Sequence, residues 1–234
     1  MSEASEKVTG IEYLPIFPLP LVLMPYELLP LHIFEPRYRQ MLKDIELRRN
    51  LFGVSFFEPP SEFEDKPKPG SLGCVAEIRQ AQTLPDERSN LLTFGLIRYR
   101  LVDYVDAGTP YFSARVEFFE DEPEPKERLT PLAEDVFELF ERVAKAAFKL
   151  SGNRGRFPEV PRAEPEQLSF LVAAAFNLDN EIKTQFIEFT STSERLDRLK
   201  DILEQAVTQM ENNAEIFSVA QKNGHSNKPI DLGE

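Results

Sequence analysis

Prolines interrupt an apolar stretch near the start of the chain. They stand at Pro15, Pro18, Pro20, Pro25 and Pro30. Because proline has no amide hydrogen and a fixed φ, this stretch cannot form one regular helix or a central strand. It is also too apolar for a solvated loop, so we predict two short strands, residues 13–17 and 27–33, joined by a buried, kinked connection. Pro36 suits the first turn of a helix, and the apolar spacing after it predicts that the helix continues to about residue 49.

Residues 51–119 show the alternation of apolar and polar positions that is typical of half-buried strands. Strands are expected at residues 51–57, from Cys74 onward, and at residues 91–105 and 111–119. Residues 58–70 are rich in proline and charge, which favours a long loop. This part of the chain is therefore predicted to be a compact, mostly antiparallel, β-rich module.

A charged segment, residues 120–128, separates this module from a region of helical periodicity. The segment has little apolar surface to bury, so we expect a solvated joint there. Four amphipathic helices are predicted beyond it, each with a start or capping signal. The signals are Thr130 with Pro131, Pro165, Asp179, and Ser191 with Glu194, and Gly152 ends the first helix. Four such helices with short joints predict a small bundle.

These boundaries divide the chain into four segments. Residues 1–10 are expected to be a disordered tail, residues 11–126 the β-rich subdomain, and residues 127–218 the helical subdomain of the same α+β domain. Residues 219–234 lack periodicity and are expected to be a second disordered tail.

The net charge of −13 over 234 residues argues against a nucleic-acid-binding protein, which usually shows a basic patch. Acidic residues gather at 58–65 and 117–127, and we interpret both clusters as solvated loop and linker rather than as cation sites. No apolar run approaches the roughly 20 residues of a membrane-spanning helix. The acidic, polar first ten residues match neither a secretory signal nor a transit peptide, so a cytoplasmic location without membrane insertion is expected.

Two motifs carry a resemblance to a known family. They are Phe17-Pro18-Leu19-Pro20 and the run LPLHIFEPRY from Leu29 to Tyr38. Both resemble the signature of the Lon N-terminal, substrate-binding domain family, and the similarity continues through residues 95–100 into the helical half, to about Met210. One departure is Asp86-Glu87-Arg88, where the family usually has glycine in the middle. Without that glycine a turn that needs positive φ becomes strained, so the turn type is left open.

The resemblance implies an α+β fold in which a β-rich, PUA-like pseudobarrel is followed by a helical bundle. It also implies a stand-alone member of the family, because this sequence lacks the motifs of the Lon ATPase and peptidase. There is no GxxxxGK[ST] phosphate loop and no Asp-Gly-Pro-Ser segment. No nucleotide-binding site and no cofactor are therefore expected.

Other catalytic chemistry has little support in the residues, since the chain has 2 histidines and 1 cysteine. We interpret His32 as a buried histidine that holds a backbone carbonyl, and Cys74 as a small core residue. Thiol catalysis would require the two to pair on the β-rich module. His32 and Glu35 form an isolated pair, which is too few ligands for a metal site. We therefore predict a non-enzyme with no catalytic residues and no metal.

The charged end of the second motif is the candidate binding surface. Its aromatic and cationic residues, which an extended peptide could contact, are His32, Phe34, Arg37 and Tyr38. A structural role competes with this one. In that interpretation Glu35 caps the helix or neutralises Arg37 or Arg39, and Tyr38 packs under the connection.

The favoured function is a non-catalytic polypeptide-binding module that resembles the Lon substrate-recognition domain and acts as a client-binding adaptor, an assembly factor or a holdase. Expected partners are unfolded or extended polypeptide segments, or one dedicated protein, rather than DNA or RNA. The alternative is a PUA-like module that senses RNA or a small ligand. A clustered basic face around Arg98, Arg100 and Arg115 would favour that alternative.

Overall fold

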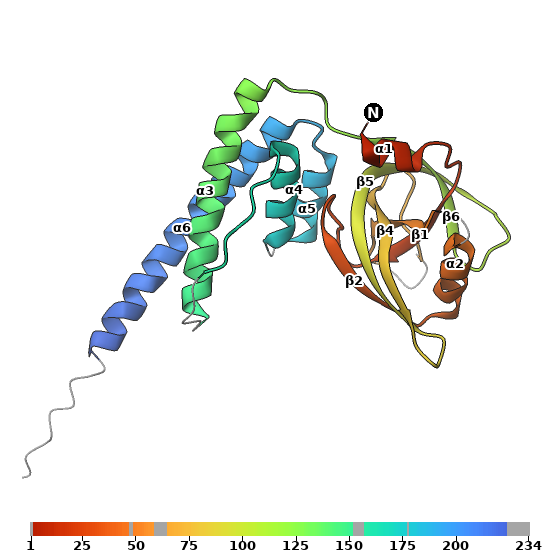
Figure 1. Cartoon of the computed structure of the whole chain (residues 1–234), viewed down its shortest axis with the longest axis horizontal. Coiled ribbons are helices and arrows are strands. Elements are labelled where there is room, and N and C mark those ends of the chain that lie inside the picture. The colour runs from red at the N-terminus through yellow and green to blue at the C-terminus, as the bar shows by residue number, and fades with distance from the viewer. Residues whose placement is uncertain (1, 47–48, 59–64, 152–156, 177, 224–234) are drawn as a thin grey trace, which may run out of the picture.

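The computed structural model describes residues 2–46, 49–58, 65–151, 157–176 and 178–223, which form a β-rich part and a helical part (Figure 1). The strands are β1 (Leu14–Leu19), β2 (Leu28–Ile33), β3 (Leu51–Phe56), β4 (Leu72–Thr83), β5 (Ser89–Val105) and β6 (Phe112–Phe119). The helices are α1 (Glu3–Val8), α2 (Pro36–Glu46), α3 (Lys126–Leu150), α4 (Pro165–Ala175), α5 (Asn180–Glu188) and α6 (Thr192–Asn223). The predicted strands and helices are thus present, with ends that differ by a few residues.

Strand β5 closes the sheet into a barrel. The strands follow the order β2-β5-β4-β3-β1-β6, and β5 pairs in addition with β6. Because β5 is 17 residues long, its residues 89–94 can pair with β2 while residues 98–105 pair with β6. The described pairs are antiparallel except for β1 with β3. This arrangement confirms the α+β class and the mostly antiparallel, barrel-like sheet.

Two apolar clusters hold the β-rich part together. One gathers residues of the closed ring of strands, among them Ile16, Leu51, Val75, Tyr99 and Ala114. The other packs α2 against the sheet through Tyr38, Met41 and Ile45, with Phe17 and Phe52 opposite them. The helical spacing of the three α2 residues places them on one face, which explains why that face is buried. Residues 47–48, where the helix is predicted to continue, lie outside the described residues.

The connection between β1 and β2 is buried and kinked, as predicted. The Tyr26 amide donates to the Gly95 carbonyl at 2.7 Å, and the Gly95 amide donates to the Glu27 carbonyl at 2.9 Å. A Cβ atom at Gly95 would lie 2.0 Å from the Met24 carbonyl oxygen, so only glycine allows this approach. Tyr26 has a φ of 67°, a left-handed conformation that is rare for a bulky residue.

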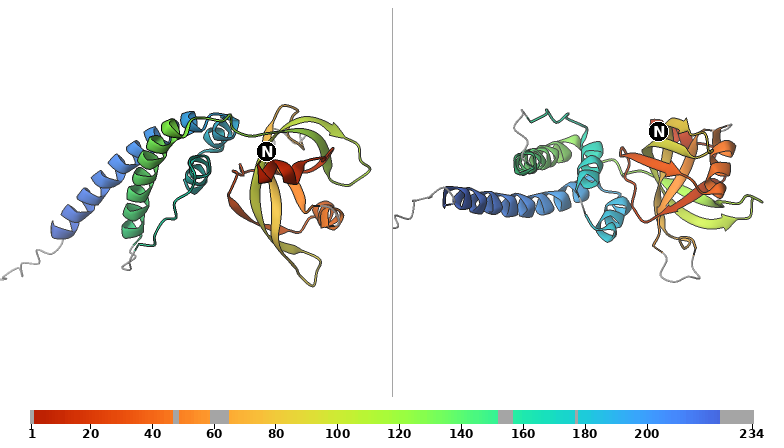
Figure 2. Two further views of the ribbon diagram at one scale, coloured as in Figure 1. Left: turned by 45° about the horizontal axis from the view of Figure 1, so that its top comes forward. Right: turned by 90° about the horizontal axis from the view of Figure 1, so that it is seen from below.

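The two parts of the molecule share one apolar core at their junction. Helices α4 and α5 lie between the barrel and the long helices α3 and α6, which pack along each other (Figures 1 and 2). Val22 and Met24 of the connection belong to the same buried cluster as Phe170, Phe186 and Leu196 of the helices. Among the described residues, no helix has the length and apolar content needed to cross a membrane.

Among the described residues, part of each predicted tail is helical. Residues Glu3–Val8 form α1, whose Val8 is buried and whose Lys7 Nζ lies 3.0 Å from the Glu77 carboxylate. Ser5 Oγ also donates to the Glu120 carboxylate at 2.7 Å, and Nη1 of Arg49 donates to the Lys7 carbonyl at 2.7 Å. Several contacts therefore tie this short helix to the β-rich part. At the other end α6 continues to Asn223, past the predicted boundary, and residues 224–234 lie outside the described residues.

Helix α3 begins earlier than the predicted start at Pro131. The structure has Pro131 inside the helix, which begins at Lys126. The reason is that proline in the second turn removes a single amide donor, which leaves only the Glu127 carbonyl without its intrahelical partner. The Arg128 and Leu129 amides donate to the Pro125 carbonyl, so the helix is already established before Pro131.

The turn between β4 and β5, whose type the sequence leaves open, has a left-handed residue in its middle. Glu87 has a φ of 64°, and its amide donates to the Leu84 carbonyl at 3.0 Å. The Glu87 carboxylate lies 3.3 Å from Nη1 of Arg39, which also donates to the Asp86 carbonyl. Glutamate therefore occupies a position that favours glycine, and Arg39 of α2 contacts it there.

Candidate functional site

Strand β2 is an open edge of the sheet. Among the described residues it pairs with β5 alone, from Leu28 opposite Phe94 to Ile33 opposite Ser89. Its residues alternate between exposed and half-buried or buried side chains. Leu28 is 57% exposed, and Pro30 and His32 follow on the same face. An unpaired row of backbone groups beside exposed apolar side chains is a surface on which another chain can add a strand.

His32 inside β2 and Phe34 just after its end continue this surface. The His32 and Phe34 rings stack with their centroids 6.2 Å apart, and Phe34 is 60% exposed. Nδ1 of His32 lies 2.7 Å from Oδ1 of Asn90. The interpretation of His32 as a buried histidine is therefore wrong, because β2 alternates and places His32 on the outer face beside Leu28 and Pro30.

Arg37 and Tyr38 are placed differently. Nε of Arg37 donates to the Glu35 carboxylate at 3.0 Å, and its guanidinium lies 4.7 Å from the Tyr38 ring centroid. Tyr38 is only 3% exposed and packs on Phe17, and burial raises the pKa of its hydroxyl to about 12. Tyr38 thus has the structural role that competed with peptide binding, and the surface retains His32 and Phe34.

The structure does not bring His32 and Cys74 together. Cys74 is fully buried, and burial raises the pKa of its thiol. The β5 residues opposite the two, Asn90 for His32 and Arg98 for Cys74, are about 26 Å apart along the strand. Within the described ranges, no group of His, Cys, Asp and Glu side chains is arranged to hold a metal ion.

The three arginines that would favour RNA binding do not form a basic face. Arg98 is buried, and Arg115 Nε donates to the Asp103 carboxylate at 2.8 Å. Nη1 of Arg100 donates to the Gly70 carbonyl at 3.3 Å. Each guanidinium is therefore directed to a partner inside the chain, and the RNA alternative gains no support.

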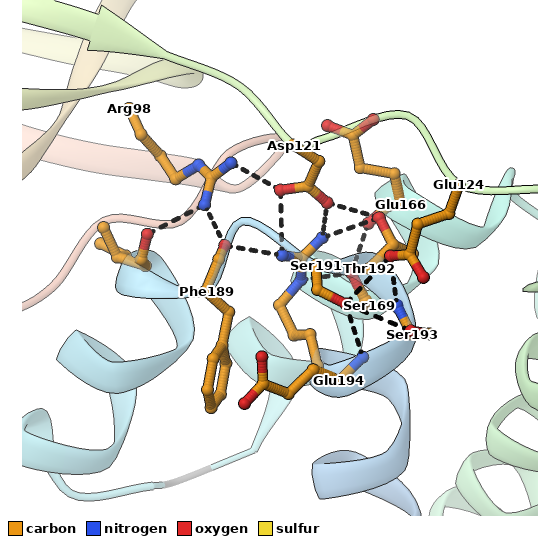
Figure 3. Close-up of polar contacts among 12 residues, drawn as sticks. Arg98, Asp121, Glu124, Glu166, Ser169, Phe189, Ser191, Thr192, Ser193 and Glu194 are labelled. Carbon is orange, nitrogen blue, oxygen red and sulfur yellow. Dashed lines mark hydrogen bonds and ion pairs between the residues drawn. The ribbon is translucent and has the colours of Figure 1, made fainter.

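A buried ion-pair cluster joins the two subdomains, and we name its residues Arg98, Asp121 and Arg195 the clamp (Figure 3). The Asp121 side chain is 5% exposed, with Nη2 of Arg98 at 2.6 Å and Nη1 of Arg195 at 3.1 Å. Arg98 comes from β5 and Arg195 from α6, while Asp121 follows β6. Since burying unpaired charge is costly, each arginine needs this carboxylate.

Further hydrogen bonds of the clamp satisfy the two guanidinium groups. Nη1 of Arg98 donates to the Ile187 and Phe189 carbonyls at the end of α5. Nε of Arg195 donates to Oγ of Ser169 at 2.7 Å, and its guanidinium lies 3.9 Å from the Phe170 ring centroid of α4. The clamp therefore ties the barrel to three helices at one point.

The start of α6 is capped from the joint as well as locally. Oγ of Ser191 accepts from the Glu194 amide at 3.1 Å, as the predicted capping box requires. The Glu124 carboxylate accepts from the Ser193 amide at 2.9 Å and from the Ser191 hydroxyl at 3.0 Å. Asp121 and Glu124 are thus structural residues, and the interpretation of residues 117–127 as a solvated linker is wrong for them.

One signal in the sequence could have revealed the clamp. Arg98 stands between apolar residues in the run Gly95-Leu96-Ile97-Arg98-Tyr99, in a strand whose residues 95–99 are all buried. A charged residue inside such a strand needs a buried partner of opposite charge. The partners themselves, in a loop and in α6, have no local signature.

Glu166 on α4 lies near the clamp and gives a pH-dependent prediction. Burial and the nearby Asp121 raise its pKa from the ordinary value of 4.5, against the opposing effect of Arg195 and Arg98. A raised folded-state pKa means that stability is present below the unfolded value and is lost as the pH rises through the folded value. We therefore expect Glu166→Gln to raise the melting temperature at about pH 7 and to have a smaller effect at about pH 4.

Thermal unfolding followed by circular dichroism at the two pH values measures this difference. Glu164→Gln is the matched control, because it removes the same charge from an exposed position in the approach to the same helix. An equal shift at both pH values for Glu166→Gln would show that ionisation of Glu166 does not limit stability.

Comparison with known proteins agrees with the fold and with the motifs. The solved Lon N-terminal domain protein from Xanthomonas campestris aligns with a TM-score of 0.57 and 21% identity over 81% of this chain and 97% of that chain. The N-terminal domain of Mycobacterium avium complex Lon protease aligns with a TM-score of 0.60 and 16% identity, covering 82% of this chain and 98% of that chain. These two structural similarities show that the chain has the fold of Lon N-terminal domains.

Comparison with the sequences of known proteins shows the family to which the chain is related. The chain is 26% identical over 195 residues to the Lon protease of Dictyoglomus thermophilum, covering 80% of this chain and 24% of that protein. It is 25% identical over 211 residues to Lon protease 2 of Herpetosiphon aurantiacus, with coverages of 89% and 26%. The chain spans about a quarter of the length of these relatives. Residues 13–205 match the family described as the ATP-dependent protease La (LON) substrate-binding domain, and the chain therefore belongs to that family.

Proposed function

We propose that this protein is a non-catalytic polypeptide-binding module that holds an extended client segment along the open edge of β2. The observation that carries the proposal is the unpaired edge itself, with Leu28 and Phe34 exposed beside it. Strand addition obtains affinity from main-chain hydrogen bonds and selectivity from the side chains on either face of the edge. Membership of a substrate-binding family supports a role in recognition.

Both faces of the edge are apolar, which indicates the class of client. Leu28 and Pro30 lie exposed on one face, and the half-buried Leu29 and Leu31 pack against the α2 cluster on the other. A strand laid beside β2 directs alternate side chains to opposite faces. The preferred client is therefore a short, continuous apolar run, as in the buried strands of a folded protein, and such a run is accessible only when that protein is unfolded.

The role that follows is that of an adaptor, an assembly factor or a holdase for unfolded chains. The net charge of −13 favours clients with basic flanks. A basic flank would increase the association rate, and this contribution would weaken as salt increases.

The test is an anisotropy titration with a labelled, reduced and alkylated lactalbumin, its folded form and an RNA oligomer, each at low and moderate salt. We expect saturable binding to the unfolded polypeptide alone. No change in anisotropy with the unfolded polypeptide would contradict the proposal. Binding of RNA alone would favour the alternative of an RNA-sensing module.

Variants locate the binding surface. His32→Pro removes an outward amide of β2, whereas His32→Ala removes the side chain and keeps the amide. We expect the proline variant to bind roughly 10-fold more weakly than the alanine variant, because it loses a hydrogen bond and adds bulk at the edge. Leu28→Ser should also weaken binding, while Val102→Ser, at a similarly exposed position of β5, should not. Equal affinities for His32→Pro and His32→Ala would place the client elsewhere.

A further inference from the structure

We propose that Pro30 sets which strands the β2 edge accepts. It permits an interrupted pairing with a client segment and prevents a continuous pairing between two copies of this chain. The part about clients rests on the proposed function, whereas the part about two copies rests on the geometry of the edge alone.

The hydrogen-bond pattern shows which β2 residues face outward. In an antiparallel ladder, residues alternate between directing both backbone groups to the neighbouring strand and directing both away from it. The Gly95 amide donates to the Glu27 carbonyl at 2.9 Å, so the odd-numbered residues that follow, Leu29, Leu31 and Ile33, face β5. The Thr93 hydroxyl donates to the Leu29 carbonyl at 2.8 Å, which agrees with this assignment.

Leu28, Pro30 and His32 therefore direct their backbone groups away from β5. Pro30 stands in the middle of this row and has no amide hydrogen, so the outward edge offers donors at Leu28 and His32 with a gap between them. A partner strand that pairs along the whole edge leaves one of its own carbonyls without a donor at Pro30. A client can leave its carbonyl opposite Pro30 hydrogen-bonded to water and still accept hydrogen bonds from the Leu28 and His32 amides at the two ends of the row.

The gap matters most for a second copy of the chain. Two β2 edges that meet around a two-fold axis at Pro30 would place this residue opposite itself, and both hydrogen bonds of the central pair would be absent. Exposed apolar edges such as this one, with Leu28 beside the row, are otherwise prone to pair with each other. Proline on an edge strand is a known way to prevent such pairing.

Pro30→Val and Pro30→Thr restore the missing donor, one with an apolar side chain and one with a polar side chain. We expect both variants to show a higher weight-average mass than the wild type at equal concentration in sedimentation. We also expect both to bind the labelled, unfolded lactalbumin roughly 2- to 10-fold more tightly, as one added hydrogen bond implies. A melting temperature close to that of the wild type shows that each variant is folded.

His32→Val is the control, because it adds an apolar side chain to the same face without adding an amide. Unchanged mass and unchanged affinity for both folded Pro30 variants would overturn the inference, and so would equal effects of His32→Val. The proposed function fails separately, when the wild-type protein does not bind the unfolded polypeptide. In that case the sedimentation result alone decides whether Pro30 prevents pairing between copies.

Discussion

Asp121→Ala is expected to lower the free energy of unfolding by about 3–5 kcal/mol, measured by urea denaturation. The substitution leaves the guanidinium groups of Arg98 and Arg195 buried without their carboxylate, at 2% and 0% side-chain exposure. Removing one partner of a buried ion pair is costly because the remaining charges stay desolvated. Here two charges are left, and they also repel each other. The hydrogen bonds to carbonyls at the end of α5 offset only part of this loss.

Asp103→Ala is the matched control for this prediction. Asp103 also pairs with an arginine, Arg115, but the two side chains are 43% and 60% exposed. An exposed pair contributes about 0–1 kcal/mol, so the urea midpoint should move little. Asp121→Asn separates charge from hydrogen bonding, since the amide oxygen can still accept from one arginine. Similar midpoints for the Asp121 and Asp103 alanine variants would show that the clamp does not hold the subdomains together.

Gly95→Ala is expected to destabilise the protein by roughly 3 kcal/mol or more. The added Cβ atom would lie 2.0 Å from the Met24 carbonyl oxygen, which is a backbone atom and cannot move alone. Residues 24–27 must therefore shift away from β5. Both hydrogen bonds between this connection and Gly95 are then lost or lengthened. Because β2 begins at Leu28, the same shift displaces the proposed edge and should weaken binding of the unfolded polypeptide.

Gly108→Ala tests whether the effect at Gly95 comes from the collision. Gly108 has a φ of 64°, and a Cβ atom added there would meet no atom within 4 Å, so alanine suffers backbone strain without a clash. We expect a loss of about 1 kcal/mol and unchanged polypeptide binding. A Gly95→Ala protein as stable as the Gly108→Ala protein would contradict the close approach.

Local signals explain which elements could be predicted. Pro36 with Tyr38, Met41 and Ile45 at helical spacing predicts α2, and the structure buries those three side chains. The exposure of His32 could not be predicted because β2 has apolar residues on both of its faces, at odd-numbered and at even-numbered positions. Leu28 and Pro30 are as apolar as Leu29 and Leu31, so the usual contrast between a buried and a solvated face is absent.

The need of Arg98 for a buried partner has a signal in the sequence, but the partners themselves could not be predicted because they are distant from it along the chain. Asp121 meets Arg98 across 23 residues and Arg195 across 74 residues. Composition alone makes a run such as EDEPEPKER resemble a solvated linker, and only the folded chain shows that its aspartate is enclosed. Helix α1 could not be predicted for the same reason, since its contacts, such as Val8 in the core and Lys7 with Glu77, are made with distant parts of the chain.

Helix α6 starts at the clamp and runs 32 residues, about 48 Å, away from the barrel (Figure 1). If the packing of α6 on α3 and α4 moves with it, the helix would act as a lever anchored at Arg195. A rotation of about 10° at Arg195 moves the far end by roughly 8 Å, the scale of a helix diameter. A small rearrangement of the barrel would thus become a large displacement at the distal end of α6. How much of the motion reaches that end would depend on how rigidly the clamp residues Arg98, Asp121 and Arg195 hold the start of the helix.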